Sequence, residues 1–455
     1  MTSALHLPAS VKSVLIASVL LLTAGTFSLF PGGQPFYEGW NVWCVLYLFF
    51  LYPWLRSARH QKASMFEYYM IALMIIVPFW MAFSARDEFG QPLIYGLLAL
   101  RNLAVISGLL YLSRALRNKT IALEDVEKSF VVLFWGLWFL YLFMRLGLNP
   151  ALFATYKKGF VSPSVGGAPA QFLLQPDYLI VGAFYYVFRG FRNQRARDYI
   201  LGLVLLAGSL GQTGRTTIVG FFATFLLLVF RWGRAKRVLL FLPKLFVGLA
   251  LVCATLFLVI PQEATNRIEM LGDAFTVVFT GKATNDSSAN THFIEALYAI
   301  PAIAKHPILG NGRLSNQWEG GAENVRGVLF YPDDVAILGV LYECGVAGLL
   351  VFGIQFWFAL RAARKIPFPV SSPLFDAAKG ILLFSALPFT NGMYVFEVPF
   401  TLVFVLLLRA GAAERSIPEE TGGKLQSFYR LFVHRAPRSP ASETASELSS
   451  GSSNA

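Results

Sequence analysis

The stretch VAILGVLYECGVAGLLVFGIQFWFAL, residues 335–360, decides the fold class of this chain. It contains a single charged residue, Glu343. It is also longer than the roughly 20 apolar residues that an α-helix needs to cross about 30 Å of hydrocarbon. The stretch therefore predicts a transmembrane helix and places the chain among membrane proteins.

Similar apolar stretches recur along most of the chain. The first has Lys12 ahead of it, as a secretory signal would, but no small-x-small cleavage site follows, so we expect a retained helix. The sixth and seventh are the shortest. We predict about twelve transmembrane helices, at 13–30, 39–55, 66–85, 91–112, 129–147, 178–187 with its flanks, 199–210, 216–230, 238–260, 335–360, 374–390 and 394–408.

The composition agrees with this all-α polytopic fold. Apolar residues make up 56% of the chain and the mean hydropathy is +0.56. Charged residues make up only 14%, against roughly 25% in soluble domains. The net charge of +12 would suggest a nucleic-acid partner in a soluble chain. The placement of the charges has to decide that question.

Every second predicted loop is basic, and these loops together carry a larger positive excess than the whole chain. Short basic loops stay in the cytoplasm, so we place both termini there and the longest loop, 261–333, outside. The basicity then reflects topology, and no nucleic-acid partner is expected. The basic residues are Arg56, Arg59, Lys62, Arg114, Arg117, Lys119, Lys128, Arg189, Arg192, Arg195, Arg197, Arg231, Arg234, Lys236, Arg237, Arg361, Arg364 and Lys365.

The chain divides into a predicted transmembrane domain, 1–410, and a cytoplasmic tail, 411–455. The tail is rich in serine and poor in apolar residues, so we expect it to be disordered. Cys44, Cys253 and Cys344 lie in or near spans without metal-ligand spacing. We expect no disulfide, no metal and no cofactor.

Arg101 and Asn102 lie in the middle of the fourth predicted span. Charge at membrane depth is costly unless it is paired or faces a wet cavity. Two readings stay open for this pair: an internal ion pair or hydrogen-bonded strut, and a functional group.

The turn Gln212-Thr213-Gly214-Arg215-Thr216-Thr217 separates the seventh and eighth spans on the outer side. Glycine permits close backbone approach, and the start of the eighth helix offers free amides to an anion. A guanidinium can grip phosphate oxygens with two hydrogen bonds. This pattern favours an anion site at Arg215. The alternative is a tight hairpin whose Arg215 reaches lipid phosphates.

The long outer loop predicts an interfacial helix, because Phe293, Leu297, Ile300 and Ala304 recur near helical spacing. Pro301 should kink this helix. Two histidines, His292 and His306, flank it. A solvated histidine tip and a catalytic histidine are the alternatives for each of them.

The sequence Pro332-Asp333-Asp334 precedes the span at 335–360 and indicates a helix start. Carboxylates there cap free amides and complement the helix dipole. Capping accounts for one aspartate, which leaves the other available for acid-base chemistry. Glu343 lies about two turns deeper in the span, and we expect it to be the structural partner of an arginine.

Three of these features together resemble the superfamily of O-antigen ligases and Wzy-type polysaccharide polymerases. The Gln-Thr-Gly-Arg-Thr-Thr turn resembles its Ser-x-Ser-Arg-type turn. His306-Pro307-Ile308-Leu309-Gly310-Asn311-Gly312 resembles its Pro-x-x-Gly-x-Gly. The segment from Asp334 to Gly348 resembles its following helix, which ends in Gly-x-x-Gly. The likeness covers roughly Gly166 to Phe352.

The resemblance implies a bacterial inner-membrane enzyme similar to metal-independent GT-C glycosyltransferases. Its substrates would be undecaprenyl-diphosphate-linked oligosaccharides, joined on the outer face. A chain-length regulator and a flippase are candidate protein partners, beside the membrane lipids. The resemblance implies Arg215 and Arg267 as diphosphate-binding residues. Beside it, we predict Arg313 as a further diphosphate-binding residue and Asp333 or Asp334 as the catalytic base. His292, Gln212 and Arg326 are further candidates.

The chain departs from the family at one place. Ligases that transfer O-antigen to lipid A core usually have a His-Asn or His-Ser pair where this chain has Asp333-Asp334. The departure favours a polymerase of exopolysaccharide or O-antigen repeats over a ligase. A transporter is the third alternative. Carriers built from repeats should show paired broken helices, and no second copy of the Gln212 to Thr217 turn is found.

Overall fold

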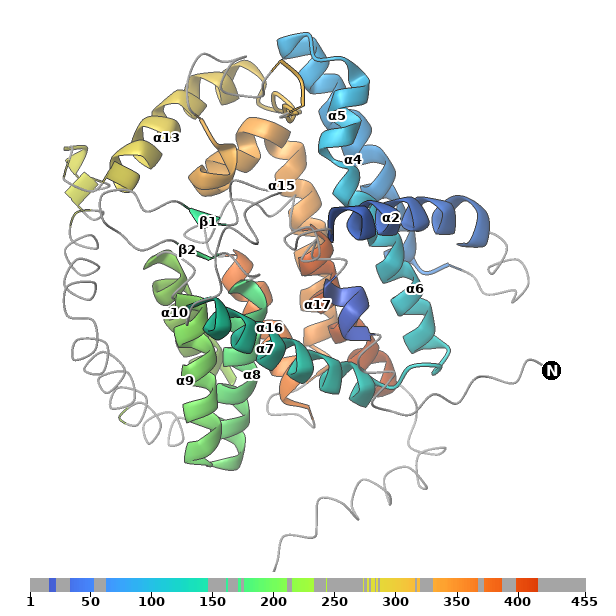
Figure 1. Ribbon diagram of the computed structural model, residues 1–455, viewed down its shortest axis with the longest axis vertical. Coiled ribbons are helices and arrows are strands. Elements are labelled where there is room, and N and C mark those ends of the chain that lie inside the picture. Colours follow the sequence, from blue (N-terminus) through green and yellow to red (C-terminus); the bar gives the residue numbers. More distant parts are fainter. Residues whose placement is uncertain are drawn as a thin grey trace, which may run out of the picture. The chain divides into compact units, whose positions relative to one another are not determined.

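The computed structural model describes residues 16–21, 33–52, 63–145, 161–162, 171–172, 176–210, 215–232, 287–315, 317–319, 330–366, 372–386 and 398–415, together with 243, 273, 276–277, 280–282 and 284. The chain divides into two compact units, Met1–Ala412 and Ala413–Ala455. Figure 1 shows the elements, all of which begin in the first unit. They are α2 Gly33–Leu46, the π-helical turn η2 Tyr47–Leu51, α4 Met65–Phe89, α5 Leu93–Ala99, the 3-10 helix η3 Arg101–Val105, α6 Ile106–Arg117, α7 Leu123–Arg145, β1 Val161–Ser162, β2 Gln171–Phe172, α8 Pro176–Asn193, α9 Ala196–Leu210, α10 Arg215–Trp232, α13 Ser287–Lys305, the 3-10 helix η5 Pro332–Val335, α15 Ala336–Ala363, α16 Pro373–Ala386 and α17 Val398–Arg415.

The described part of the chain is helical apart from one short strand pair. The strands β1 and β2 have two residues each and pair antiparallel, with Val161 opposite Phe172. They lie in the connection between the fifth and sixth predicted spans, where the sequence predicts no regular structure. The prediction of an all-α fold therefore holds for every longer element that the structure describes.

Three described helices are long and apolar enough to cross a membrane, over Met65–Phe89, Leu123–Phe143 and Ile337–Ala363. A bent pair of helices makes a fourth if it is counted as one span. The three helices correspond to the third, fifth and tenth predicted spans, and the bent pair corresponds to the fourth. The predicted span at 238–260 lies outside the described residues except for 243. The total of about twelve stays a prediction.

The fourth predicted span is not one straight helix. It is broken at Leu100 into α5 and the helical stretch Arg101–Arg117, which consists of η3 and α6, and the two parts are bent by 52°. Arg101 lies at this break, where two of its nitrogens donate to the carboxylate of Glu38, the shortest at 2.9 Å, and Nη1 donates to the carbonyl of Leu98 at 2.8 Å. The helix bends where a cation has to find partners inside an apolar run. Of the two readings left open, the structure confirms the ion pair.

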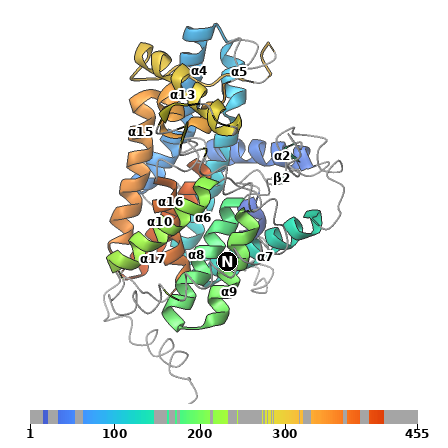
Figure 2. The same cartoon turned by 90° about the vertical axis from the view of Figure 1, so that its left-hand side faces the viewer.

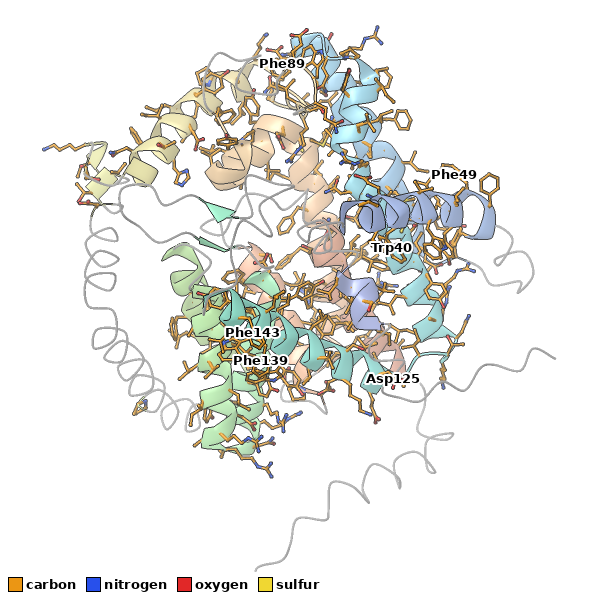
Figure 3. All side chains as sticks on the ribbon, viewed as in Figure 1. Trp40, Phe49, Phe89, Asp125, Phe139 and Phe143 are labelled. Carbon is orange, nitrogen blue, oxygen red and sulfur yellow. The ribbon has the colours of Figure 1, made fainter. Side chains whose placement is uncertain are left out.

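Close helix contacts hold the rest of the unit together. Helices α8 and α9 form an antiparallel pair, and a Cβ at Gly202 would come within 2.7 Å of the Val187 side chain. Helix α16 packs on α8, where the Gly380 backbone lies against the ring of Phe184. Other aromatic side chains face outward, including Phe49, Phe139 and Phe143, which Figure 3 labels. Exposed apolar surface of this extent is what lipid contact requires.

Helix α4 has polar groups at both ends, and these define the two ends of the unit. Its first turn carries Glu67 and its last turn carries Arg86 and Glu88. In the predicted topology the Glu67 end is the inner end and the Glu88 end is the outer end. Helix α15 packs along α4, and α13 packs on α15, as the two views in Figures 1 and 2 show.

Candidate functional site

Helix α15 is interrupted at Gly345, which has φ 60° and ψ −161°. This backbone conformation is accessible only to glycine. The break frees the amides of Val346 and Ala347 from their usual helical acceptors. They donate instead to the carbonyls of Pro307 at 2.9 Å and Ile308 at 3.0 Å. The turn after α13 thus supplies the acceptors that the helix lacks.

The same turn also satisfies the carbonyls that the break sets free. The amide of Asn311 donates to the carbonyl of Tyr342 at 2.8 Å, and the amide of Gly312 donates to that of Glu343 at 2.9 Å. The side-chain amide of Asn311 adds a second bond to Tyr342, at 2.9 Å. Non-helical backbone inside a membrane protein is tolerated only where its polar groups are satisfied. The turn and the broken helix form one hydrogen-bonded unit.

The glycines of this turn are required by space. Gly310 and Gly312 both have positive φ, 71° and 76°. A Cβ at Gly310 would collide with the backbone of Glu343, and one at Gly312 would collide with the backbone of Ala85 in α4. The turn is wedged between two helices at backbone contact. The Pro-x-x-Gly-x-Gly pattern seen in the sequence thus has a packing reason in this structure.

A buried glutamine fixes the chain that leaves the turn. Gln91 follows the C-cap of α4 and is fully buried. Its Nε2 donates to the carbonyl of Arg313 at 3.2 Å, and its Oε1 accepts from the amide of Ser315 at 2.7 Å. The Arg313 side chain lies 3.5 Å from the carboxylate of Glu343. The expectation that Glu343 is the structural partner of an arginine is therefore confirmed.

The carboxylate of Glu295 ties α13 to the segment that precedes the aspartate pair. Glu295 is 2% exposed. One oxygen accepts the amide of Tyr331 at 2.9 Å, and the other lies 3.1 Å from Nδ1 of His292. Phe330 packs its ring between the rings of Tyr298 and Tyr342. Glu295 therefore fixes the backbone immediately ahead of Pro332–Val335.

The opposite face of α13 is apolar and exposed. Ile294, Leu297 and Ile300 on this face are each more than half exposed, whereas Glu295 and Ala299 are buried. The helix runs through Pro301 to Lys305. A helix is thus found where the spacing predicts one, and its place in the membrane interface stays a prediction.

An ion cluster joins the end of α13 to the end of α4. Glu88 lies 2.8 Å from Nζ of Lys305 and 2.8 Å from Nε2 of His306. From the sequence alone, a solvated tip and a catalytic group are both open for His306. The structure gives it a carboxylate partner at the outer end of α4.

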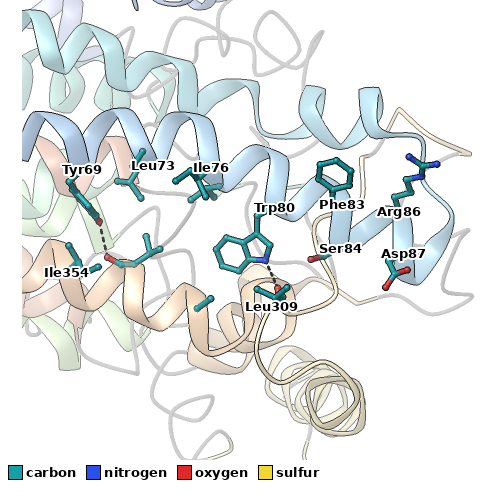
Figure 4. A pocket seen from close by; sticks show the side chains of 14 residues that line it. Tyr69, Leu73, Ile76, Trp80, Phe83, Ser84, Arg86, Asp87, Leu309 and Ile354 are labelled. Carbon is teal, nitrogen blue, oxygen red and sulfur yellow. Dashed lines mark hydrogen bonds between the residues drawn. The ribbon is translucent and has the colours of Figure 1, made fainter.

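A cavity of about 1050 Å³ lies between α4 and α15. Its walls are mostly apolar, and Trp80 at its centre donates from Nε1 to the carbonyl of Leu309 at 3.0 Å (Figure 4). At one end Tyr69 donates to the carbonyl of Val351, and at the other end lie Arg86 and Asp87. At 1.5 Å per residue the cavity follows α4 for roughly 27 Å. It is an apolar groove that leads to charged residues at the outer end.

The structure describes only part of the predicted site. Arg215 is the first residue of α10, and Asp333 and Asp334 form the middle of η5, but the side chains of all three lie outside the described residues. Gln212, Arg267 and Arg326 lie outside them entirely. Of the candidates, His292 and Arg313 are described with side chains, and they pair with Glu295 and Glu343. The roles of these residues stay predictions.

Several residues of this region were missed by sequence reasoning. Glu88 connects α4 to Lys305 at the end of α13, and Gln91 connects the end of α4 to Ser315. Glu295 connects α13 to Tyr331. A signal existed for Glu295, because His292 and Glu295 are three residues apart and share one helix face. Among the described residues no group of three or more histidines, cysteines or carboxylates could hold a metal ion.

The helices and the apolar groove define an integral membrane protein. Residues 199–353 match the family model described as O-antigen ligase, Wzy_C. The matched segment begins in α9, includes the start of α10 and contains the turn wedged into α15. The match confirms the resemblance to the O-antigen ligase and Wzy-type superfamily, whose members are membrane glycosyltransferase-like enzymes. A search of curated proteins finds no match.

Proposed function

We propose that the protein polymerises undecaprenyl-diphosphate-linked oligosaccharide repeats at the outer face of a bacterial inner membrane, in exopolysaccharide or O-antigen synthesis. One observation carries the proposal. The family-matched turn 307–312 is locked into the break of α15, and its Leu309 lines the groove between α4 and α15. This arrangement suits a substrate with a long apolar chain and a polar head.

The length of the groove supports a polyprenyl donor. It follows α4 for roughly 27 Å, whereas one leaflet offers only about 15 Å of a hydrocarbon core of roughly 30 Å. A chain longer than a phospholipid tail would use the whole groove. Its diphosphate would then lie near the outer ends of α4 and α15, the region that contains Arg86 and the 307–315 turn.

In the proposed reaction, a hydroxyl of the incoming lipid-linked repeat attacks the anomeric carbon of the growing chain. A new glycosidic C–O bond forms as the bond from that carbon to the diphosphate breaks, and undecaprenyl diphosphate leaves. Asp333 or Asp334 accepts the hydroxyl proton. Arg215, with Arg267 and Arg313, stabilises the negative charge that develops on the leaving diphosphate. The step needs no redox partner.

The second candidate function is an O-antigen ligase, because the matching family model carries that description. The two functions share a donor and differ in the acceptor. The aspartate pair at 333 and 334, in place of the ligases' His-Asn or His-Ser pair, favours the polymerase. A chain-length regulator and a flippase would be partners of the polymerase.

Reconstitution with a defined lipid-linked repeat tests the proposal. The purified protein in liposomes should convert single repeats into a ladder of longer lipid-linked products. Transfer to added lipid A core, with no ladder, would establish the ligase instead. Asp333→Asn and Asp334→Asn, made separately, should differ in rate because only one carboxylate acts as the base. If the double variant still polymerises, the aspartate pair is not the base.

A further inference from the structure

Four arginines from three helices, α6, α15 and α17, lie at the inner end of the unit. Arg114 and Arg117 of α6 lie 3.7 Å and 2.7 Å from the carboxylate of Glu67. Arg409 of α17 stacks on the rings of Phe66 and Phe358, at 4.8 Å and 5.3 Å. We call Arg114, Arg117, Arg361 and Arg409 the inner arginine cluster.

Arg361 completes the cluster from the last turn of α15. Its guanidinium lies 5.4 Å from the ring of Trp357, which packs against Phe358. Arg409 lies near enough to Arg361 and Glu67 to interact electrostatically with both. Arg114, Arg117 and Arg409 thus interact with the one carboxylate of Glu67, and Arg361 interacts with Arg409. Among the described residues of the cluster, four positive charges stand against one negative charge.

Arg114 is buried, and two of its hydrogen-bond donors are unsatisfied among the described residues. Arg114 is 5% exposed, and its guanidinium lies over the ring of Tyr52 at 4.5 Å. Its Nε and Nη2 atoms have no hydrogen-bond partner within the described part of the chain. A buried guanidinium with free donors is costly. An anion that accepts from these donors would offset that cost.

We propose that the inner arginine cluster binds an anionic phospholipid of the cytoplasmic leaflet. Basic pockets between transmembrane helices on the cytoplasmic side suit lipid phosphates. Guanidinium groups grip phosphate oxygens with paired hydrogen bonds. The exposed ring of Trp357 supplies apolar surface for the glycerol and first acyl carbons. A headgroup with two phosphates matches the excess of three positive charges best.

Lipid binding by the full-length protein in detergent tests this site. The probes are a fluorescent tetra-acyl diphosphate lipid of the cardiolipin type, a zwitterionic phosphatidylethanolamine and inorganic pyrophosphate. The diphosphate lipid should bind saturably and raise the unfolding temperature. Each cluster arginine near the surface is worth about 1 kcal/mol, so Arg361→Gln should weaken binding roughly fivefold. Arg409→Gln should do the same.

Arg364→Gln is the matched control, because Arg364 is an exposed arginine at the same end of α15. It should change binding less than about twofold. Arg361 is exposed, so its substitution should leave the protein folded even if Arg409→Gln does not. An equal loss from Arg364→Gln would reduce the site to general surface charge and overturn the proposal. Equal stabilisation by the zwitterionic lipid, or by pyrophosphate alone, would also overturn it.

Discussion

Buried polar groups are satisfied differently at the two ends of α4. At the outer end, backbone groups freed by the break at Gly345 are satisfied by the backbone of the 307–312 turn. At the inner end, a fully buried Glu67 is surrounded by arginines. The backbone hydrogen bonds at the outer end carry no net charge and fix the geometry of the turn. The excess positive charge at the inner end attracts an anion. The outer end is therefore suited to positioning a reaction, and the inner end to holding lipid.

The largest expected difference comes from the same substitution made at the two ends of α4. Glu67→Gln removes the only described carboxylate among four arginines and leaves buried positive charge unpaired. It should lower the free energy of unfolding by roughly 3–5 kcal/mol. Glu88→Gln removes an ion pair to a Lys305 side chain that is 63% exposed, and should cost less than about 1 kcal/mol. Thermal and denaturant unfolding in detergent measure both. Equal losses would remove the distinction between the two ends.

The break in α15 offers the next test. Gly345→Ala forces a side chain into a glycine-only backbone region, where the new Cβ would collide with the carbonyl of Ile308. The unfolding free energy should fall by about 3 kcal/mol, the upper value for such strain. Gly353→Ala in the same helix is the control, because a Cβ there meets nothing within 4 Å. If Gly345→Ala is as stable as Gly353→Ala, the wedged turn is not required.

Glu295 tests whether the outer end positions the aspartate turn. Glu295→Ala leaves the amide of Tyr331 and the ring of His292 without their partner and should cost about 1–3 kcal/mol. Polymerisation should fall further than stability alone explains. Glu295→Gln keeps an acceptor oxygen for Tyr331 and should recover most of the turnover. A glutamine variant as inactive as the alanine variant would argue against positioning through this hydrogen bond.

The groove provides the smallest effect. Ile76 lines the groove, and Ile76→Trp should obstruct the lipid chain of the donor. The obstructed lipid chain would lose apolar contact equivalent to about one buried side chain, ~1.5 kcal/mol of binding free energy. We therefore expect KM for the donor to rise roughly tenfold with kcat nearly unchanged. Ile75→Trp is the control, since Ile75 is exposed on the same helix and does not line the groove. Identical kinetics for the two variants would exclude the groove as the donor site.

The sequence predicts much of this architecture because hydropathy and charge act locally. The spans at α4, α7 and α15 follow from their apolar runs, and the pairing of Glu343 with an arginine follows from the cost of a lone charge in a span. The break at Gly345 could not be predicted. A glycine in an apolar run is common in transmembrane helices, and its partners lie more than thirty residues earlier in the chain.

The contacts of the candidate site were harder to predict for the same reason. Glu295 reaches Tyr331 and Glu88 reaches Lys305 across 36 and 217 residues. Such contacts depend on how α4, α13 and α15 pack, and no local pattern encodes that packing. The bend at Arg101 could not be predicted for a related reason, because its partner Glu38 belongs to another helix.

In the proposed reaction, lipid-linked repeats are joined at the outer end of this unit and Arg215 stabilises the leaving diphosphate. The most direct measurement is polymer length from reconstituted Arg215→Ala protein supplied with a defined lipid-linked repeat, beside wild type and the inner-end control Arg364→Gln. A lost donor of this kind lowers the rate roughly 10² to 10³-fold. We therefore expect ladders from wild type and the control, and single repeats from Arg215→Ala at equal membrane levels. Chains of normal length from Arg215→Ala would contradict the assignment.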